Sequence, residues 1–384
     1  MPTPETAAHL MLVSGEASGD RYAAELVEEL RTRHPAWTYS GMGGEASRTA
    51  GIELIVDSTG LAVVGLVEVL RHYREIRSAL KTLKAQVLAR RPALLVLVDY
   101  PEFNLRLARF AHRHGVPVLF YISPQIWAWR AWRVREIRRH VDHMAVVFPF
   151  ERDFYEEHNV PVTYVGHPLR GQTSPAQPPD AVRERWGLDA QRPVIGLFPG
   201  SRRSELAHLM PVCTGAVRQL QDHPARPQFA LVMAPGLKPD DYALWLADLP
   251  EVKCLQEPIY DAMQVCDMAV AASGTVTLQL ALMRVPFCMT YRLAGLSYVL
   301  ARLLVRIDRY CLANIVAGED LVTELIQADA TPQRIANVLT PWLDEPARLD
   351  QIQEKLKVVE ERLGPAAGMS RLADCTEQMI SVSR

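Results

Sequence analysis

Two loops in the second half of the chain carry residue types that bind phosphate. The first follows the apolar run VIGLF and reads PGSRRSEL, with Gly200, Ser201 and Arg202 just before a predicted helix. A glycine lets the backbone approach a phosphate, a helix N-terminus presents free N–H groups, and an arginine clamps phosphate oxygens with two donors. A plain strand-to-helix turn with a serine cap is the alternative. The motif alone leaves both interpretations open.

The second loop follows the run DMAVAA and reads SGTVTLQLAL, so that Ser273, Gly274 and Thr275 begin another helix. Two loops of this kind in one half of a chain favour a convergent diphosphate site over two unrelated turns. The chain contains neither a GxxxxGK[ST] loop nor a GxGxxG fingerprint. ATPase and simple dehydrogenase functions therefore lose their main support.

Carboxylates follow the predicted strands of the first half. Asp99 comes directly after the run ALLVLV, where it faces the ligand-binding edge of a parallel sheet and can accept a proton from a hydroxyl group. The same position also suits a cap for the helix that follows. The first predicted strand runs into SGEASGD, which contains Gly15, Glu16, Ser18 and Asp20. This loop is either substrate-facing or a capped helix start with an acid in its first turn.

The segment 121–143 mixes aromatic and basic side chains. It contains Trp127, Trp129 and Trp132 among Arg130, Arg133, Arg135, Arg138 and Arg139. Such a mixture is typical of a site for single-stranded nucleic acid, a phosphorylated ligand or a lipid interface. A core tryptophan cluster beside a solvated basic helix is the alternative. Because the net charge of the chain is -2, nucleic acid is the weakest of these interpretations, and we expect no nucleic-acid partner.

Apolar residues keep helical spacing between positions 66 and 87, and basic residues fill the positions between them. The stripe and its flanks include Leu66, Leu70, Tyr73, Arg71, Arg74 and Arg77. An apolar stripe edged with cations is typical of a helix that lies in a membrane surface. Each cation near an anionic surface contributes about 1 kcal/mol. A helix that covers a sheet is the alternative, and it is favoured for the C-terminal half of the segment.

The elements that position these residues are short apolar runs that alternate with helical patterns from end to end. The predicted strands are residues 9–15, 93–99, 117–122, 143–148, 194–198, 228–234 and 267–272. Continuous apolar runs indicate strands that are covered on both faces, as in a parallel sheet wound with helices. The composition changes once, at the proline-rich stretch 168–180. The fold class is therefore α/β, with two Rossmann-like doubly wound domains that face a cleft.

Composition excludes several other classes of protein. The 384 residues are 49% hydrophobic and 22% charged, which is typical of a globular protein and excludes a disordered, collagenous or globally basic chain. The six cysteines include no CxxC pair, so a reducing compartment and no structural metal are expected. Neither a signal peptide nor an apolar run of about 18 residues is visible. The sequence predicts a cytoplasmic protein.

Taken together, the loops resemble those of one family, the lipid-A-disaccharide synthases, which are inverting glycosyltransferases of the two-Rossmann-domain GT-B type. The matching strings, in order along the chain, are SGEASGD, GLAVVGLVEVL, VDYPEFN, YISPQIWAWR, VVFPFERDFYEEHNVPVTYVGHP, LFPGSRRSEL, ASGT and YRLAGLSYVLARLLVRIDRYCLANIVAG. The resemblance implies transfer of 2,3-diacylglucosamine from its UDP derivative to the 6-hydroxyl of 2,3-diacylglucosamine 1-phosphate (lipid X), which yields a β-1,6 disaccharide and UDP. It also implies no metal or other cofactor, a site of action at the cytoplasmic face of the bacterial inner membrane, and a homodimer.

The resemblance assigns roles to residues. Asp99 is the candidate base, with Glu16 the next candidate, and Arg202 stabilises charge on UDP together with N–H groups at Ser201 and at Gly274 to Thr275. The UDP site also takes in Gly200, Glu205, Ser273 and Gln279. The motifs also carry over residues on the acceptor side, which are Gly15, Ser18, Asn104 and His167. An N-terminal acceptor domain is expected at 1–168 plus 346–384, because the final helices of this fold type cross back to it, and a UDP-sugar domain is expected at 182–345.

One position departs from the family pattern. Gln279 stands where the family usually has a glutamate, four residues after the threonine of SGT, that is expected to hold the ribose hydroxyls. This difference keeps two alternatives open. One is a related UDP-sugar glycosyltransferase or epimerase of cell-envelope biosynthesis, and the other is a non-catalytic paralogue that binds a nucleotide sugar or a lipid. Asp99 and Arg202 argue against the non-catalytic alternative.

Overall fold

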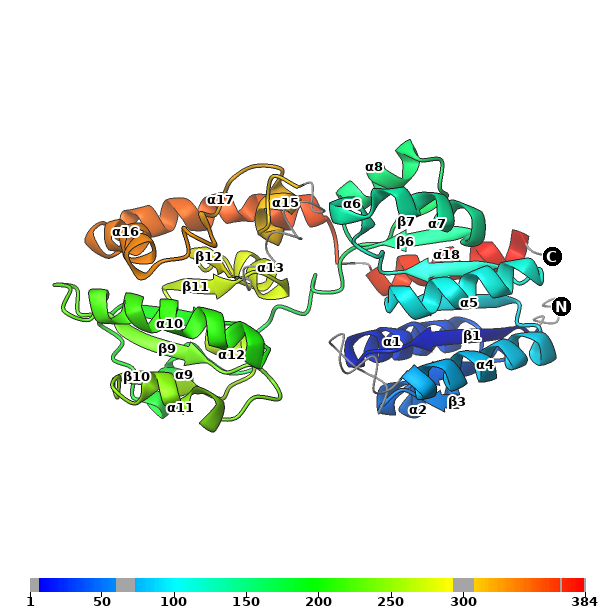
Figure 1. The fold of residues 1–384 in the computed structure, drawn as a ribbon, viewed down its shortest axis with the longest axis horizontal. Coiled ribbons are helices and arrows are strands. Elements are labelled where there is room, and N and C mark those ends of the chain that lie inside the picture. Colours follow the sequence, from blue (N-terminus) through cyan, green and yellow to red (C-terminus); the bar gives the residue numbers. More distant parts are fainter. Residues whose placement is uncertain (1–6, 60–72, 293–306, 367, 383–384) are drawn as a thin grey trace. The chain divides into compact units, whose positions relative to one another are not determined.

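A computed structural model describes residues 7–59, 73–292, 307–366 and 368–382. The chain divides into two compact units, Met1–Pro168 with Pro365–Arg384 and Leu169–Gly364. Each unit is a parallel sheet with helices on both faces (Figure 1). The α/β doubly wound architecture predicted from the sequence is thus confirmed for both units. Among the described helices, none is both long enough and apolar enough to span a bilayer.

The first unit contains a seven-stranded sheet in the order β3-β2-β1-β4-β5-β6-β7. Its strands are β1 (His9–Ser14), β2 (Thr38–Gly43), β3 (Glu53–Asp57), β4 (Leu94–Val98), β5 (Val118–Tyr121), β6 (His143–Val146) and β7 (Val162–Tyr164). Its helices are α1 (Ala17–Arg33), α2 (Glu45–Thr49), α4 (Tyr73–Arg90), α5 (Pro101–Arg113), α6 (Ile126–Trp129), α7 (Val134–His140), α8 (Pro149–Glu157) and α18 (Gly368–Val382). Strands β1 and β4 lie side by side at the centre, with Ser14 opposite Val98, so their following loops are neighbours.

The second unit contains a six-stranded sheet in the order β10-β9-β8-β11-β12-β13. Its strands are β8 (Val194–Phe198), β9 (Gln228–Val232), β10 (Val252–Leu255), β11 (Met268–Ala272), β12 (Phe287–Tyr291) and β13 (Glu324–Ile326). Its helices are α9 (Pro179–Trp186), α10 (Arg203–Leu220), α11 (Asp240–Leu246), α12 (Ile259–Met263), α13 (Thr275–Leu282), α15 (Leu312–Ala317), α16 (Pro332–Asp344) and α17 (Ala347–Leu363). Strands β8 and β11 are adjacent, so the PGSRR and SGT loops leave the same edge of this sheet.

Helix α17 lies in a different unit from the one expected from the sequence. The return to the N-terminal domain was predicted at residue 346, but α17 packs against α13 and α15 within the second unit. Its buried residues Leu356, Val359 and Leu363 follow one helical face, which explains this packing. The chain returns at Pro365, and α18 alone packs against α1 and β4 of the first unit.

Candidate functional site

The loops after β1 and β4 bring Glu16 and Asp99 together in the first unit. Asp99 and Tyr100 both have left-handed backbones, with φ of 48° and 49°, which is rare for residues other than glycine. Burial, and to a smaller extent the nearby charge of Glu16, raise the pKa of Asp99 to about 6. A carboxylate with a pKa close to neutrality, held in a strained loop, is a suitable general base.

The structure does not support a capping role for Asp99. Helix α5 begins at Pro101, and its N-cap residue is Tyr100 and not Asp99. The side chain of Tyr100 makes no capping hydrogen bond. The Asp99 carboxylate bonds only to the adjacent backbone N–H of Tyr100. The interpretation of Asp99 as a helix cap, which the sequence left open, is therefore wrong.

Asn104 holds the Asp99 loop. Its side chain is fully buried, and Nδ2 donates to the carbonyl oxygens of Asp99 at 2.6 Å and Val98 at 3.2 Å. The sequence predicted Asn104 on the acceptor side of the site. Its amide nitrogen thus stabilises the two left-handed residues, whereas its buried Oδ1 has no hydrogen-bond partner in the described part of the chain. The assignment of Asn104 to the acceptor side stays a prediction.

The remaining residues of the SGEASGD loop divide between structural and exposed positions. Gly15 is needed because a Cβ atom there would lie 2.4 Å from the ring of Tyr100. Glu16 and Ser18 are exposed at the start of α1. Asp20 is buried, and its carboxylate accepts hydrogen bonds from the N–H groups of Gly44, Ala46 and Ser47 at 2.7, 3.0 and 3.2 Å. Asp20 therefore holds the N-terminus of α2, not that of its own helix as the sequence suggested.

His167 follows β7 and is almost entirely buried. Its ring packs at 4.9 Å against that of Phe148, and burial lowers its pKa to about 4. The imidazole is therefore neutral near pH 7 and contributes no positive charge to the site. Its assignment to the acceptor side stays a prediction.

Glu151 is a buried acid that the sequence analysis missed. It lies in the first turn of α8, where its carboxylate accepts from the Phe148 N–H at 3.2 Å and from the Trp127 indole at 3.3 Å. Burial raises its pKa to about 8, although these hydrogen bonds act in the opposite direction. The string FPFE, with proline and then glutamate after the N-cap, indicates a helix start. Nothing in this string indicates that the Glu151 carboxylate is buried and hydrogen-bonded to Trp127.

The aromatic and basic segment is not a tryptophan core. Trp129 and Trp132 are 41% and 69% exposed, whereas Trp127 is partly buried against Glu151. Arg133 is buried and pairs with Glu102 at 2.6 Å. The core-cluster interpretation is therefore wrong for the exposed tryptophans, and a role for them in binding a phosphorylated ligand or a lipid stays a prediction.

Helix α4 combines an exposed start with a buried C-terminal half. Tyr73 is 49% exposed, and Arg74 and Arg77 are also exposed. Buried side chains lie at Ala79, Leu83 and Val87. The C-terminal half thus covers the sheet, as the sequence favoured. The other predicted membrane residues, Leu66, Leu70 and Arg71, lie outside the described residues.

The PGSRR loop of the second unit is closed by Glu205. Gly200 has a φ of 109°, and a Cβ atom on it would collide with the Glu205 side chain. The Glu205 carboxylate accepts from the N–H groups of Ser201 at 2.9 Å and Arg202 at 3.3 Å. The expectation that the Ser201 N–H is open to a diphosphate is wrong here, because Glu205 in the first turn of α10 already occupies it. The Arg202 guanidinium lies 3.5 Å from the Glu205 carboxylate, and its side chain is 60% exposed, so it is still accessible to a ligand.

The SGT loop leaves its backbone donors open. Gly274, with a φ of 145°, is the N-cap of α13, and no side chain caps this helix. The N–H of Thr277 donates to the carbonyl oxygen of Gly274 at 3.1 Å, so the N–H groups at Gly274 to Thr275 are the ones that suit a phosphate. Ser273 Oγ instead donates to the carbonyl oxygen of Tyr310 at 3.1 Å, which fixes the start of the loop.

A buried network holds the Tyr310 segment in turn. The Glu324 carboxylate accepts from the N–H groups of Tyr310 and Cys311 at 2.9 and 3.0 Å and from Asn314 Nδ2 at 2.9 Å. Asn314 also exchanges two hydrogen bonds with the backbone of Val322, at 2.8 and 2.9 Å. This network explains the string YCLANIVAG. Through Tyr310 it also fixes Ser273 and hence the start of the SGT loop.

Gln279 lies one turn into α13 and is paired with a tyrosine. Its Nε2 lies 3.2 Å from the hydroxyl of Tyr260 on α12. The side chain is only partly buried, so one amide oxygen stays available to a ligand. A glutamate in its place would keep the Tyr260 contact, because a tyrosine hydroxyl can donate to a carboxylate.

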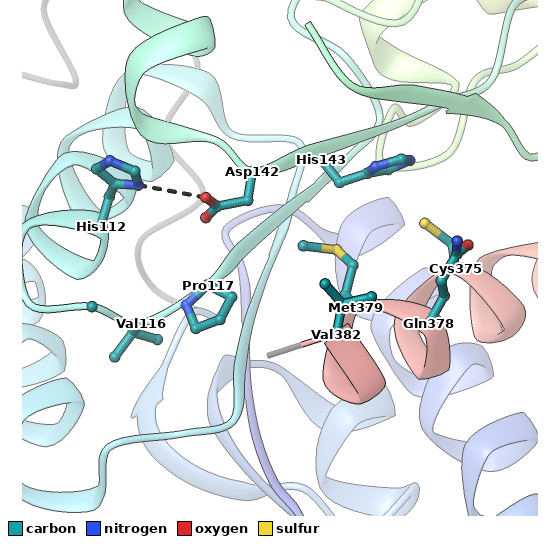
Figure 2. A pocket seen from close by; sticks show the side chains of 10 residues that line it. His112, Val116, Pro117, Asp142, His143, Cys375, Gln378, Met379 and Val382 are labelled. Atoms are coloured by element: carbon teal, nitrogen blue, oxygen red, sulfur yellow. Dashed lines mark ion pairs between the residues drawn. The ribbon is translucent and has the colours of Figure 1, made fainter. Parts of the chain in front are cut away.

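A separate pocket of 440 Å³ lies at the opposite edge of the first sheet, next to α18. Figure 2 shows His112 directed at Asp142, 3.6 Å away, with Met379 and Val382 of α18 on the other side of the strand. None of the predicted site residues lines this pocket. Parallel sheets bind ligands at the carboxyl ends of their strands, so this pocket is not part of the candidate site.

Solved structures with the same fold include epimerases and glycosyltransferases. The UDP-GlcNAc 2-epimerase of Neisseria meningitidis, solved with UDP-GlcNAc, has a TM-score of 0.66 at 12% identity over 97% of this chain and 100% of that one. The calicheamicin glycosyltransferase has a TM-score of 0.62 at 16% identity over 98% of both chains. The fold is therefore that of the GT-B class, which contains both glycosyltransferases and epimerases.

Sequence comparison separates these alternatives. The family model described as lipid-A-disaccharide synthetase matches residues 10–375. The lipid-A-disaccharide synthase of Geobacter sulfurreducens is 46% identical over 98% of this chain and 99% of its own length, and that of Nitrosococcus oceani is 43% identical over 96% and 95%. The chain belongs to the lipid-A-disaccharide synthetase family. It is a glycosyltransferase of lipid A biosynthesis.

Proposed function

We propose that the protein transfers 2,3-diacylglucosamine from UDP-2,3-diacylglucosamine to the 6-hydroxyl of 2,3-diacylglucosamine 1-phosphate. The products are the β-1,6-linked disaccharide and UDP. The observation that carries this proposal, beside membership of the family, is the Glu16 and Asp99 pair. An inverting transfer needs one base next to the acceptor hydroxyl, and the raised pKa of Asp99 suits that role.

The first unit supplies the acceptor chemistry in this proposal. The acceptor oxygen forms its bond to the anomeric carbon while the bond from that carbon to the UDP oxygen breaks. The proton of the hydroxyl passes to Asp99, and the electron pair of the broken bond leaves with UDP. Attack from the face opposite the leaving group inverts the configuration of the sugar.

The second unit supplies the donor site. The exposed guanidinium of Arg202 and the open N–H groups at the start of α13 stabilise the negative charge that develops on the diphosphate. Because Glu205 already satisfies the Ser201 N–H, the SGT loop is the stronger backbone donor of the two. Gln279 holds the ribose with its amide.

The start of α4 is the proposed point of attachment to the cytoplasmic face of the inner membrane. Tyr73, Arg74 and Arg77 are exposed there, and an aromatic side chain flanked by cations is typical of a helix that lies in a membrane surface. Replacement of both arginines by glutamate is expected to release the protein from anionic vesicles, and 0.5 M salt is expected to weaken binding of the original protein. Equal binding of both proteins would mean that this end of α4 only covers the sheet.

A homodimer is also proposed, on the family resemblance alone. Sedimentation equilibrium over a range of protein concentrations measures the assembled mass. A monomer at every concentration would contradict this part of the proposal.

The test of the proposed function is incubation of the purified protein with both acylated sugars, followed by measurement of UDP and of the disaccharide by mass spectrometry. Asp99→Asn is expected to bind the UDP-sugar normally but to lose most transfer, because a neutral amide is a poor proton acceptor. Asp153→Asn, an exposed acid of the same unit, is the matched control. Transfer to a different acceptor would favour another envelope glycosyltransferase. Binding without any turnover would favour a non-catalytic paralogue.

A further inference from the structure

A groove of 880 Å³ lies between α4 and α5 in the first unit. This volume is within the range of about 300–1,000 Å³ that is typical of small-molecule sites. The groove begins at Tyr100 and Pro101, which directly follow the candidate base Asp99 in the chain. It therefore reaches the loop that carries the candidate base.

The floor of the groove is apolar. Ile76 and Leu80 lie four residues apart on α4, so they share one face of the helix. Both are only partly buried against the core, and the ring of Phe103 on α5 lies beside them in the lining. Apolar side chains left open in a concave surface indicate a ligand that covers them.

The rim of the groove is strongly basic. Its cations come from both helices and are Arg77, Lys81, Lys84, Arg106, Arg109 and Arg113. Arg109 pairs with Glu136, and the single carboxylate in the lining, Glu102, pairs with Arg130 at 2.9 Å and Arg133 at 2.6 Å.

Most of these rim cations lack an acidic partner. Arg77, Lys81, Lys84 and Arg113 form no ion pair with any residue in the described part of the chain, whereas the charge of Arg106 acts on Glu102. Like charges gathered around one concavity repel each other, so the arrangement favours the entry of an anion.

We propose that this groove binds the acceptor lipid, with an acyl chain on the apolar floor and the sugar phosphate among the rim cations. This inference rests on the proposed function, which supplies an acceptor that is both acylated and phosphorylated. A phosphate monoester carries about 1.5 to 2 negative charges near pH 7 and accepts bonds from several cations at once. A bilayer phospholipid is the competing occupant, but a concave groove of 880 Å³ that reaches the loop of Asp99 fits a single bound molecule better than a flat lipid surface.

The first test removes one rim cation from each helix in the variant Lys81→Ser/Arg106→Ser. The probes are 2,3-diacylglucosamine 1-phosphate and the same lipid without its phosphate, both in mixed micelles. The original protein is expected to bind the phosphorylated lipid at least tenfold more tightly, and the variant is expected to lose this preference. The change in this preference between the original protein and the variant isolates the contact between the phosphate and the rim cations. An unchanged preference in the variant would overturn the proposal.

The second test is kinetic and uses matched controls. The variant is expected to raise KM for the acceptor at least tenfold and to leave KM for the UDP-sugar within twofold. Arg138→Ser/Arg139→Ser removes two exposed cations of α7 outside the groove and is expected to change neither value. Leu80→Trp fills the floor and is expected to shift the preference toward shorter acyl chains. An equal rise of both KM values, or a loss of vesicle binding that fully accounts for the rise, would contradict a site for the acceptor.

These measurements separate the inference from the proposed function. Binding of the phosphorylated lipid in the absence of any UDP-sugar does not require transfer, so it tests the groove alone. Phosphate-dependent binding without disaccharide formation would refute the proposed function and leave the groove assignment intact. Normal transfer with unaltered binding in the Lys81→Ser/Arg106→Ser variant would refute the groove assignment and leave the proposed function intact. A melting temperature unchanged in each variant excludes unfolding as the cause.

Discussion

The pair of Glu16 and Asp99 predicts a specific pH dependence that the variant Glu16→Gln tests. Asp99 acts as a base only when ionised, so kcat/KM is expected to fall as the pH drops through its pKa, which is raised from 3.8 to about 6. Burial is the larger cause of this rise and the charge of Glu16 the smaller one. Removal of the Glu16 charge therefore lowers the pKa of Asp99 and moves the acid limb of the profile to lower pH.

The size of this movement follows from the exposure of Glu16. A charge at short range in a partly solvated site changes the energy of its neighbour by about 1 kcal/mol, which corresponds to roughly 0.7 pH unit. The full return of the pKa to 3.8 is not expected, because the burial of Asp99 is unchanged. The assay is kcat/KM for transfer between pH 4.5 and 8.5, measured at low salt because screening weakens the coupling.

The control is Glu157→Gln, which removes an exposed glutamate of α8 from the same unit. Its acid limb is expected to coincide with that of the original protein. Asp99→Asn is expected to abolish the limb together with most of the activity. An acid limb that stays in place or moves upward in Glu16→Gln would show that Asp99 is not the titrating base, and the reasoning from its pKa would be refuted.

Three further predictions concern other residues of the site and core. Arg202→Ala is expected to lower kcat by about 10²-fold, because it removes a donor to developing charge, while Arg203→Ala, an exposed neighbour paired with Asp241, is expected to change it little. Gln279→Glu is expected to tighten UDP by about 1 kcal/mol, or roughly fivefold, in a calorimetric titration, because a charged acceptor binds the ribose hydroxyls more strongly; weaker binding would mean that the pocket is built around the amide. Relative to Glu151→Gln, the free energy of unfolding of the original protein is expected to fall by about 1.4 kcal/mol per pH unit between pH 5 and 8, because the folded-state pKa of about 8 lies above the ordinary 4.5. Parallel stability curves in urea across this range would show that Glu151 is not protonated in the folded state.

The central strands were predictable from the sequence because both of their faces are buried. The runs at 194–198 and 267–272 coincide with β8 and β11 to within one residue, since the residues of each strand itself carry no polar side chain. The peripheral strands were missed for a physical reason. Strand β2 reads TYSGMG and β7 has only three residues, so neither carries a sustained apolar run. Their place in the sheet is set by neighbouring strands rather than by their own composition.

The candidate site was predictable in location but less so in the role of each side chain. Position after a strand was enough to place Asp99 and the two phosphate loops at the binding edge of their sheets. Contacts between distant segments were not predictable. Nothing in the string SGEASGD shows that Asp20 holds Gly44, 24 residues away, and nothing in GSRRSE shows that the acid closes its own loop.

The polar residues of both half-sites divide by exposure into those that hold loops and those that can meet a substrate. Asn104, Glu205 and Glu324 use their hydrogen-bonding groups on backbone carbonyl or N–H groups. The same chemical groups bind hydroxyls and phosphates, which is why Asn104 and Glu205 were predicted from the sequence as ligand-binding residues. Such contacts fix the loops before a substrate arrives, and a preorganised loop loses less entropy on binding. Glu16, Asp99, Arg202 and the amide oxygen of Gln279 keep capacity that a substrate can use, and our proposal therefore assigns the chemistry to these groups.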